Sequence, residues 1–222
     1  MRIRFKPWAR PELEACKFYI DEPESYKGKW SKLFENSNPI YLELGCGKGS
    51  FISQMAVLHQ NINYIAIDVV DAMLGLAKRN IEAIYQEKNV EISNIYLTRF
   101  DIERILLMLD EHDKIHRIYI NFCNPWPRGK HRKKRLTHTR QLEKYKVFLK
   151  EDGEIYFKTD DDGLFLDTIH YLEDCGFEII KKTFDLENEE NFWENIQTEH
   201  EKMFIEQGIK IKAVIAKNNN VK

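Results

Sequence analysis

A glycine-rich turn between an apolar strand and a helix is the feature that most constrains the fold of this chain of 222 residues. Residues 40–44 form a short, mostly apolar run, and a helical pattern begins at residue 50. Gly45, Gly47 and Gly49 occupy the turn between them. Glycine adopts positive φ angles without strain and lets a ligand approach the backbone closely. The segment therefore predicts a nucleotide-like ligand bound over a strand-to-helix turn.

Short β-branched or aromatic runs alternate with longer helical patterns along the rest of the chain. This alternation is typical of βαβ units and predicts an α/β, Rossmann-like fold, in which a seven-stranded, mostly parallel sheet has helices on both faces. The expected strands are 40–44, 64–68, 95–98, 117–122, 154–158, 178–183 and 211–216. The expected helices are 50–59, 71–88, 102–112, 138–150, 163–175 and 192–207. The length favours a single domain over residues 1–222, with residues 1–38 as a basic, partly helical or flexible lead-in.

The composition excludes several classes of protein. The sequence has no stretch of about 18 uncharged apolar residues and no apolar core of a signal peptide near its start, so we expect a cytoplasmic protein without a membrane partner. The four cysteines are scattered without a C-x-x-C pair. This spacing favours neither a zinc site nor a disulfide framework, and we expect no metal.

Two acids accompany the glycine turn. Glu43 stands two residues before Gly45, where a carboxylate would repel a pyrophosphate but could accept hydrogen bonds from an ammonium group. Asp68 ends the second expected strand, where it could accept from both ribose hydroxyls. This order resembles that of class I methyltransferases, which implies S-adenosylmethionine as the cofactor. The alternatives are a capping role for Glu43 and an ordinary strand-end position for Asp68.

A third acid, Asp101, follows the third expected strand. Enzymes that this chain resembles place an adenine-binding acid there. The position also suits the N-cap of a helix beginning near Ile102, because an aspartate there accepts a hydrogen bond from the first helical turn. The two roles can coexist.

The fourth expected strand ends in a loop that contains two prolines. Asn124 and Trp126 each precede a proline, which fixes φ and removes a backbone donor. Ligands of open α/β sheets bind at the carboxyl ends of the strands, so this loop should face the methyl donor. The ring of Trp126 could stack on a base removed from its helix. The alternative is that Trp126 belongs to the core.

A cationic segment follows this loop directly. Residues 128–140 hold seven Lys/Arg and no acid, and residues 1–10 hold four more, although the net charge of the chain is −2. Such segregation favours a polyanionic partner over a small neutral substrate. A solvated charged loop is the alternative. We expect phosphate contacts, and hence RNA binding, from Lys130, Arg132, Lys133, Lys134 and Arg135.

Five sequence blocks resemble the tRNA (guanine-N7)-methyltransferase family of bacteria. They occur in the family's order and span nearly the whole chain, at residues 4–9, 42–49, 121–136, 157–160 and 195–201. The resemblance implies methyl transfer from S-adenosylmethionine to N7 of a guanosine in tRNA, in the variable loop, by a monomer or a homodimer. It implies a cofactor site formed by Glu43, Gly45, Gly47, Asp68, Asp101 and Asn124. It also implies contacts to the tRNA or its target guanine from Arg128, Asp160, Thr198 and Glu201.

The chain departs from the family pattern at two loop positions. Many members carry aspartate where this chain has Asn124, and lysine where it has Arg128. A neutral amide cannot usefully accept a proton near pH 7. Guanine N7, however, has a lone pair and no hydrogen, so its attack on a methyl group needs no base. We therefore expect catalysis by alignment, with Asn124 positioning groups through hydrogen bonds.

The methylated purine carries a positive charge, which nearby carboxylates should stabilise. Asp160 and Glu201 could also accept from guanine N1–H and the exocyclic amine. Residues 185–201 hold seven acids and no Lys/Arg, which is unusual for an RNA-binding face unless part of the segment reads a base. An acidic, solvated helix start is the alternative for Glu187, Glu189 and Glu190.

Three other functions compete with this interpretation. An Asn-Pro-aromatic loop also serves enzymes that methylate exocyclic nitrogens of DNA or RNA, but Asn124 to Pro127 departs from their usual order and no target-recognition domain accompanies it. A non-catalytic RNA-binding module would have lost Glu43 and Asp68. A small-molecule methyltransferase would leave the basic segment 128–140 without a purpose. We therefore expect tRNA, and not DNA, as the partner.

Overall fold

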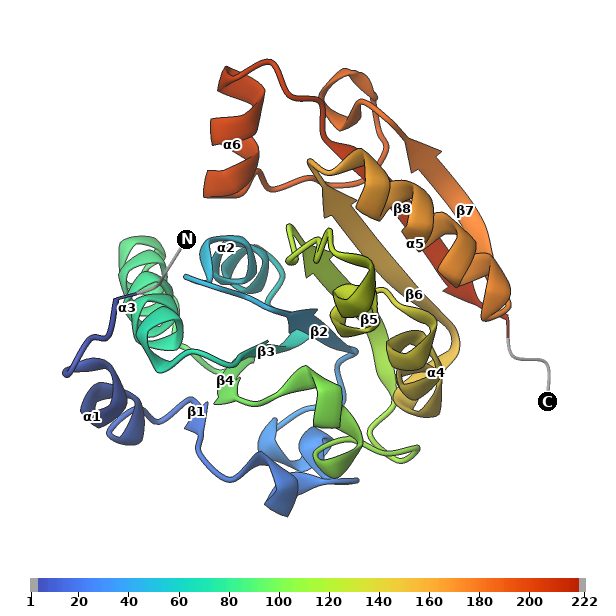
Figure 1. Cartoon of the computed structure of the whole chain (residues 1–222). Helices are drawn as coiled ribbons and strands as arrows, with labels where there is room; N and C mark the ends of the chain where they lie inside the picture. The colour runs from blue at the N-terminus through green and yellow to red at the C-terminus, as the bar shows by residue number, and fades with distance from the viewer. Residues whose placement is uncertain (1–3, 220–222) are drawn as a thin grey trace. The chain divides into compact units, whose positions relative to one another are not determined.

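The computed structural model describes residues 4–219, which form two compact units that divide between Asp113 and Lys114. Within the described residues there are eight strands, where the sequence predicted seven (Figure 1). The additional strand, β1 (Tyr19–Ile20), has two residues, which is too short to produce a recognisable alternation of apolar and polar side chains. No helix in this part of the chain has the length and apolar character needed to cross a bilayer.

The first unit contains parallel strands in the order β1-β4-β3-β2. Its longer strands are β2 (Ile40–Leu44), β3 (Asn63–Asp68) and β4 (Ile95–Arg99). Leu44 pairs with Ile67, so β2 and β3 end at the same edge of the sheet. Both faces of these strands are buried, as is usual for parallel sheets covered by helices.

Three α-helices lie in the described part of this unit: α1 (Ala9–Glu14), α2 (Ser50–Leu58) and α3 (Asp71–Lys88). In Figure 1, α2 and α3 lie side by side, and both pack on β3. The apolar face of α3 is buried, and the helix ends at Asn89, whose φ of 52° is the left-handed conformation of a common C-cap. The predicted span of this helix, 71–88, is confirmed.

The lead-in before β2 is folded against the same unit. It contains α1 and two 3-10 helices, η1 (Pro23–Tyr26) and η2 (Trp30–Leu33). The buried carboxylate of Asp113 accepts hydrogen bonds from the backbone N–H groups of Gly28 and Trp30, at 2.9 and 3.1 Å. These bonds tie the lead-in to the end of the unit.

The second unit contains strands in the order β5-β6-β8-β7, of which β5 and β6 are parallel and the other two pairs antiparallel. The strands are β5 (Ile115–Asn121), β6 (Leu149–Thr159), β7 (Phe177–Thr183) and β8 (Lys212–Asn218). Its helices are α4 (Thr139–Phe148), α5 (Asp162–Asp174) and α6 (Glu199–Glu206). Helix α5 packs on β6, β7 and β8, and α4 packs on β6 (Figure 1). When the strand pairs within the two units are taken together, more of them are parallel than antiparallel, as predicted.

Three segments differ from the predicted helices. The expected helix 102–112 is the 3-10 helix η3 (Ile102–Leu107), because Arg104 has non-helical backbone angles. The expected helix 192–207 begins only at Glu199, because Thr198 caps its first turn. The basic segment contains an unpredicted 3-10 helix, η4 (Gly129–Lys134). A further short helix, η5 (Leu186–Asn188), precedes α6.

Candidate functional site

The glycine turn of the first unit is built from three residues with positive φ. Gly45, Gly47 and Gly49 have φ angles of 78°, 55° and 70°. A Cβ on Gly49 would lie 2.8 Å from the Cβ of Ala77, so the close packing of α2 on α3 requires glycine there. A Cβ on Gly47 would meet no atom within 4 Å. The backbone at Gly47 is therefore open to an approaching ligand.

Asp68 joins this turn to the end of β3. Its Oδ2 accepts from the N–H of Gly47 at 3.0 Å, and its Oδ1 accepts from the N–H of Val70 at 2.9 Å. Burial raises the pKa of Asp68 despite these bonds. Each carboxylate oxygen has a second lone pair that can accept from a hydroxyl group. The strand-end role and the predicted ribose-binding role of Asp68 are therefore compatible.

Glu43 lies within β2, two residues before the turn, and only 2% of it is exposed. It pairs in register with Ala66 of β3. A position inside a strand excludes the alternative that Glu43 caps a helix. Its place in the strand beside the turn is compatible with the predicted binding of a cationic ligand group.

A cavity of about 300 Å³ is lined by residues at the ends of β3 and β4, namely Val69, Arg99 and Phe100. Val69, half exposed, provides an apolar wall, and Asp101 lines the same cavity. Asp101 accepts from the N–H of Glu103 at 3.0 Å and caps η3, so the N-cap alternative is confirmed. The side chain is exposed and its cap uses one oxygen, so an adenine-binding role remains open. The lead-in also lines the cavity, through Asp21, Pro23 and Glu24.

The loop after β5 in the second unit contains two bulky residues with positive φ, Phe122 at 51° and Trp126 at 41°. Such residues rarely adopt this conformation, and the surrounding structure must hold them in it. The exposed Asn124 stabilises the loop, because its Oδ1 accepts from the N–H of Trp126 at 3.0 Å. The loop is therefore held in a defined, strained conformation.

Trp126 is only partly buried, so the alternative that it belongs to the core is wrong. The ring centroid of His131 lies 5.6 Å from that of Trp126. The Nζ of Lys134 lies 5.2 Å from the Trp126 centroid, within cation–π range. An aromatic ring with a cation against it is suited to stacking on a base.

The basic segment presents most of its charges to solvent. Arg128 and four of the five predicted phosphate-binding residues are exposed, namely Lys130, Arg132, Lys133 and Lys134. Arg135 differs, because it is 3% exposed. Its guanidinium donates to the carbonyl of Pro125 at 2.6 Å and pairs with Asp167. Arg135 thus holds the proline-containing loop in place, and its charge is not presented to a phosphate as we had expected.

Asp160 follows β6, at the same edge of the second unit as the Asn124 loop, because Asn121 of β5 pairs in register with Lys158. Burial raises the pKa of Asp160, which is half-buried. Within residues 4–219, no other side chain donates a hydrogen bond to its carboxylate; the ammonium of Lys212 donates to its backbone carbonyl instead, at 2.9 Å. The Asp160 carboxylate can therefore accept from a ligand.

Thr198 and Glu201 are both buried and form a capping box at the start of α6. The Oγ1 of Thr198 accepts from the N–H of Glu201 at 3.1 Å, and the carboxylate of Glu201 accepts from the N–H of Thr198 at 3.3 Å. Both side chains are thus engaged within the protein. Their contact with the target guanosine stays a prediction.

Lys158 is a residue that we did not single out from the sequence. It is fully buried near the end of β6, and its Nζ lies 2.6 Å from Oε2 of Glu201. Its position within the block 157–160 was a signal, because a lysine inside an apolar strand requires a buried anionic partner.

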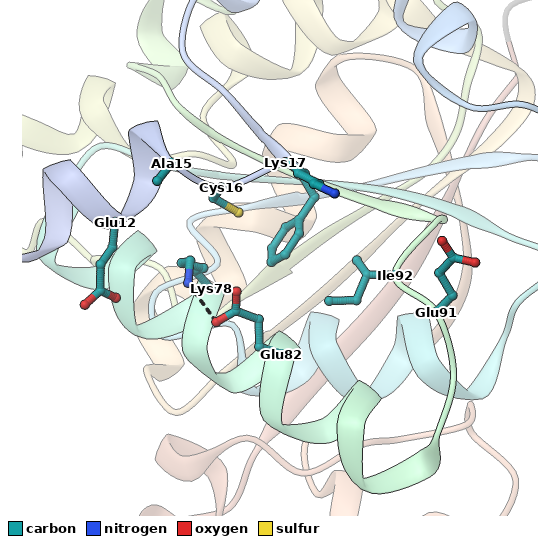
Figure 2. A pocket seen from close by; sticks show the side chains of 9 residues that line it. Glu12, Ala15, Cys16, Lys17, Lys78, Glu82, Glu91 and Ile92 are labelled. Atoms are coloured by element: carbon teal, nitrogen blue, oxygen red, sulfur yellow. Dashed lines mark hydrogen bonds and ion pairs between the residues drawn. The ribbon is translucent and has the colours of Figure 1, made fainter.

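A second cavity, of about 480 Å³, lies in the first unit beside α1 and α3 (Figure 2). Cys16, Phe18 and Ile92 supply apolar lining. The ammonium of Lys78 pairs with Glu82 at 2.7 Å, as the dashed line in Figure 2 marks. None of the predicted site residues lines this cavity.

Comparison with known proteins shows close relatives over almost the full length. The sequence model of a family described as "Putative methyltransferase" matches residues 37–214. A tRNA (guanine-N(7)-)-methyltransferase of Clostridium botulinum is 61% identical over 216 residues, which is 97% of this chain and 98% of that protein. A protein of the same name from Clostridium beijerinckii is 59% identical over 220 residues, which is 99% of this chain and 100% of that protein.

Solved structures with the same fold are more distant in sequence. An antibiotic-related methyltransferase superposes with a TM-score of 0.61 at 20% identity, covering 86% of this chain and 92% of that one. The 16S rRNA methyltransferase KamB superposes with a TM-score of 0.59 at 11% identity, covering 85% and 92%. The predicted Rossmann-like methyltransferase fold is confirmed, with eight strands instead of seven.

Proposed function

The chain belongs to the tRNA (guanine-N7)-methyltransferase family, and from this premise we propose that it transfers a methyl group from S-adenosylmethionine to N7 of a guanosine in tRNA, giving 7-methylguanosine. The observation that carries the proposal is the 61% identity to a relative of that name over 97% of the chain. Because the proposed substrate is tRNA, we also propose that the protein acts in the cytoplasm. By resemblance to the family, we propose the variable loop as the site of methylation and a monomer or homodimer as the active form.

The first unit has the features that S-adenosylmethionine requires. Glu43 would bind its ammonium group, Gly47 leaves the turn open for close approach, and Asp68 would bind the ribose hydroxyls. The cavity between Val69 and Asp101 would hold the adenine. When bound, S-adenosylmethionine supplies a sulfonium-linked methyl group that a nitrogen lone pair can attack.

The second unit has the features that a target nucleotide in RNA requires. The partly exposed ring of Trp126 would stack on the base, and the half-buried carboxylate of Asp160 would accept from its N–H groups. Arg128 and the exposed cations of η4 would contact phosphates. Phosphate contacts of this kind make affinity fall steeply with salt.

The reaction needs no general base, because guanine N7 carries a lone pair and no proton. Asn124 stabilises the loop through its hydrogen bond to the backbone of Trp126, and this would fix the orientation of the stacked base. Alignment of the reacting atoms can contribute roughly 7–11 kcal/mol to a rate enhancement. The charge of Asp160 would stabilise the purine as it becomes positive.

The test is transfer of labelled methyl from S-adenosylmethionine to unmodified tRNA by the purified protein. We expect the product to be cleaved at 7-methylguanosine by reduction and aniline, and a map of the cleavage site to place it in the variable loop. Label on an exocyclic nitrogen, or on DNA alone, would show a methyltransferase of a different specificity.

A further inference from the structure

A buried ammonium group lies at the carboxyl end of β6 in the second unit. The Nζ of Lys158 donates to three acceptors: Asn195 Oδ1 at 2.8 Å, the Ile196 carbonyl at 3.1 Å and Glu201 Oε2 at 2.6 Å. These match the three N–H donors of an ammonium group. The side chains of Lys158 and Glu201 are only 1% and 2% exposed. Lys158 therefore connects the end of β6 directly to the segment that leads into α6.

Both carboxylate oxygens of Glu201 are bound within the protein. Oε1 accepts from Nδ2 of Asn195 at 2.6 Å, and Oε2 accepts from Lys158 and from the backbone N–H of Thr198. The ammonium nitrogen, 2.6 Å away, also offsets the negative charge of Glu201. Oε1 of Glu201 keeps a second lone pair, but only 2% of the side chain is exposed, so a guanine base could reach it only by opening this buried cluster. The ion pair would also stabilise a positive purine only weakly.

Asp160 lies two residues beyond Lys158 and is in the opposite situation. Its carboxylate is half-buried, and within residues 4–219 no other side chain donates a hydrogen bond to it. The ammonium of Lys212 is occupied by the Asp160 carbonyl and, at 2.7 Å, by Asp162. The charge of Asp160 is thus available both to N–H donors and to a purine that becomes positive.

The Lys158 network also supports the strained loop after β5. The Nζ of Lys158 lies 5.9 Å from the ring centroid of Phe122, whose φ is 51°. The ring of Phe122 also stacks on two rings of α6. Its centroid lies 6.3 Å from that of His200 and 5.9 Å from that of Phe204. A change at Lys158 would therefore reach both α6 and the loop that carries Asn124.

We propose that Lys158 is a positioning residue, which holds residues 195–201 and the Phe122 loop in place through its ion pair with Glu201, and that of the two carboxylates Asp160 alone reads the guanine. This inference rests on the proposed function. Glu201 contributes by binding Lys158 and capping α6. The resemblance to the family had placed Glu201 in contact with the tRNA or its target, so the inference reassigns it.

The first test removes the ion pair as a whole. Lys158→Met alone leaves a buried, unpaired carboxylate, whereas Lys158→Met combined with Glu201→Leu replaces the pair with apolar groups, a change that folded proteins often tolerate. The double substitution Arg117→Met/Glu154→Leu is the matched control, because it removes another ion pair of the same unit, with a 2.7 Å contact. All variants are compared with Asp160→Asn for kcat and KM with tRNA and for binding of S-adenosylmethionine.

We expect Asp160→Asn to lower kcat/KM for tRNA about 100-fold and Lys158→Met to lower it by a comparable factor through misplacement. The variant that lacks the whole Lys158–Glu201 pair should recover to within about tenfold of wild type, because the two apolar side chains replace the ion pair with a packing contact between β6 and α6. The Arg117/Glu154 control should match wild type. If the paired variant folds and binds S-adenosylmethionine but is as impaired as Asp160→Asn, Glu201 reads the base and the inference is wrong.

A second measurement does not depend on the double variant folding. The charged and titratable groups around Asp160 are Asp161, Lys212, His200 and Cys123. The activity should fall at acid pH as the carboxylate that reads the base becomes protonated. If Asp160 is the only such carboxylate, this acid limb of the plot of kcat/KM against pH should disappear in Asp160→Asn. Persistence of that limb at saturating S-adenosylmethionine would show that another carboxylate titrates in the reaction, and would overturn the inference that Asp160 alone reads the guanine. Failure of the wild-type protein to form 7-methylguanosine would instead overturn the proposed function and the inference with it.

Discussion

The backbone N–H of Gly47 donates a 3.0 Å hydrogen bond to Oδ2 of Asp68, which joins the glycine turn after β2 to the end of β3. The second oxygen of Asp68 accepts from Val70, at the start of α3. One carboxylate therefore orders the turn through hydrogen bonds within the protein. A site that is already ordered loses less conformational entropy on binding.

Asp68→Ala should weaken the binding of S-adenosylmethionine about 10- to 100-fold. Hydrogen bonds to a charged group contribute about 1.5–3 kcal/mol each, and each 1.4 kcal/mol is a factor of ten in affinity. Titration calorimetry measures the effect. Glu82→Ala is a control on α3, because it removes a carboxylate that pairs with Lys78 on the surface. Unchanged affinity in Asp68→Ala would exclude Asp68 from the cofactor site.

Trp126→Ala should lower kcat/KM for tRNA about 10- to 100-fold, since stacking on an aromatic ring contributes about 1–3 kcal/mol per base. Trp126→Phe should retain most of the activity, because it keeps a flat ring. Affinity for S-adenosylmethionine should remain unchanged in both. Equal losses in the Phe and Ala variants would indicate that the indole nitrogen or the shape of the loop matters, and not stacking.

Substitution of Arg135 by alanine should lower the stability of the protein. Substitution of Lys133, two residues away in the basic segment, should leave the stability almost unchanged. Arg135→Ala should lower the free energy of unfolding by about 2 kcal/mol, because it leaves the Pro125 carbonyl without its charged donor and leaves Asp167 with only the longer, 3.5 Å contact to the exposed Arg132. Lys133→Ala should change stability by less than about 0.5 kcal/mol. Urea denaturation distinguishes them.

The same pair should differ in RNA binding. Lys133 is exposed, so its loss should weaken tRNA binding and reduce the slope of log affinity against log salt by about one unit. Filter binding at several salt concentrations measures the slope. An unchanged slope in Lys133→Ala would place the bound phosphates elsewhere.

Asp160→Asn should raise the free energy of unfolding at pH 7 although it impairs activity. Burial raises the pKa of Asp160, so the fold favours the protonated form; the stabilising contribution of this carboxyl is present below its unfolded pKa and is lost as the pH rises through the folded pKa. Asparagine stays neutral throughout. The difference between variant and wild type should therefore shrink between pH 7 and pH 4. A variant less stable than wild type at pH 7 would contradict this sign.

Local patterns in the chain were sufficient for the frame of the cofactor site. The apolar run of β2, the three glycines and the strand-end Asp68 are short-range features, because glycine's φ freedom and the period of a strand are properties of neighbouring residues. They correctly predicted the strand–turn–helix unit. The two-residue β1 had no such pattern and depends on its pairing with β4.

Local features thus determined the seven longer strands, the glycine turn and the distribution of charge. The state of each charged side chain depended on partners far away in the sequence. Lys158 and Glu201 are 43 residues apart, and Arg135 and Asp167 are 32 apart. Whether a carboxylate or a guanidinium is available to a ligand depends on burial and on these partners, which exist only after distant strands and helices pack together. Folding therefore buried two residues predicted to bind a ligand, Glu201 and Arg135, among partners within the protein, and left the carboxylate of Asp160 half-buried without a side-chain donor.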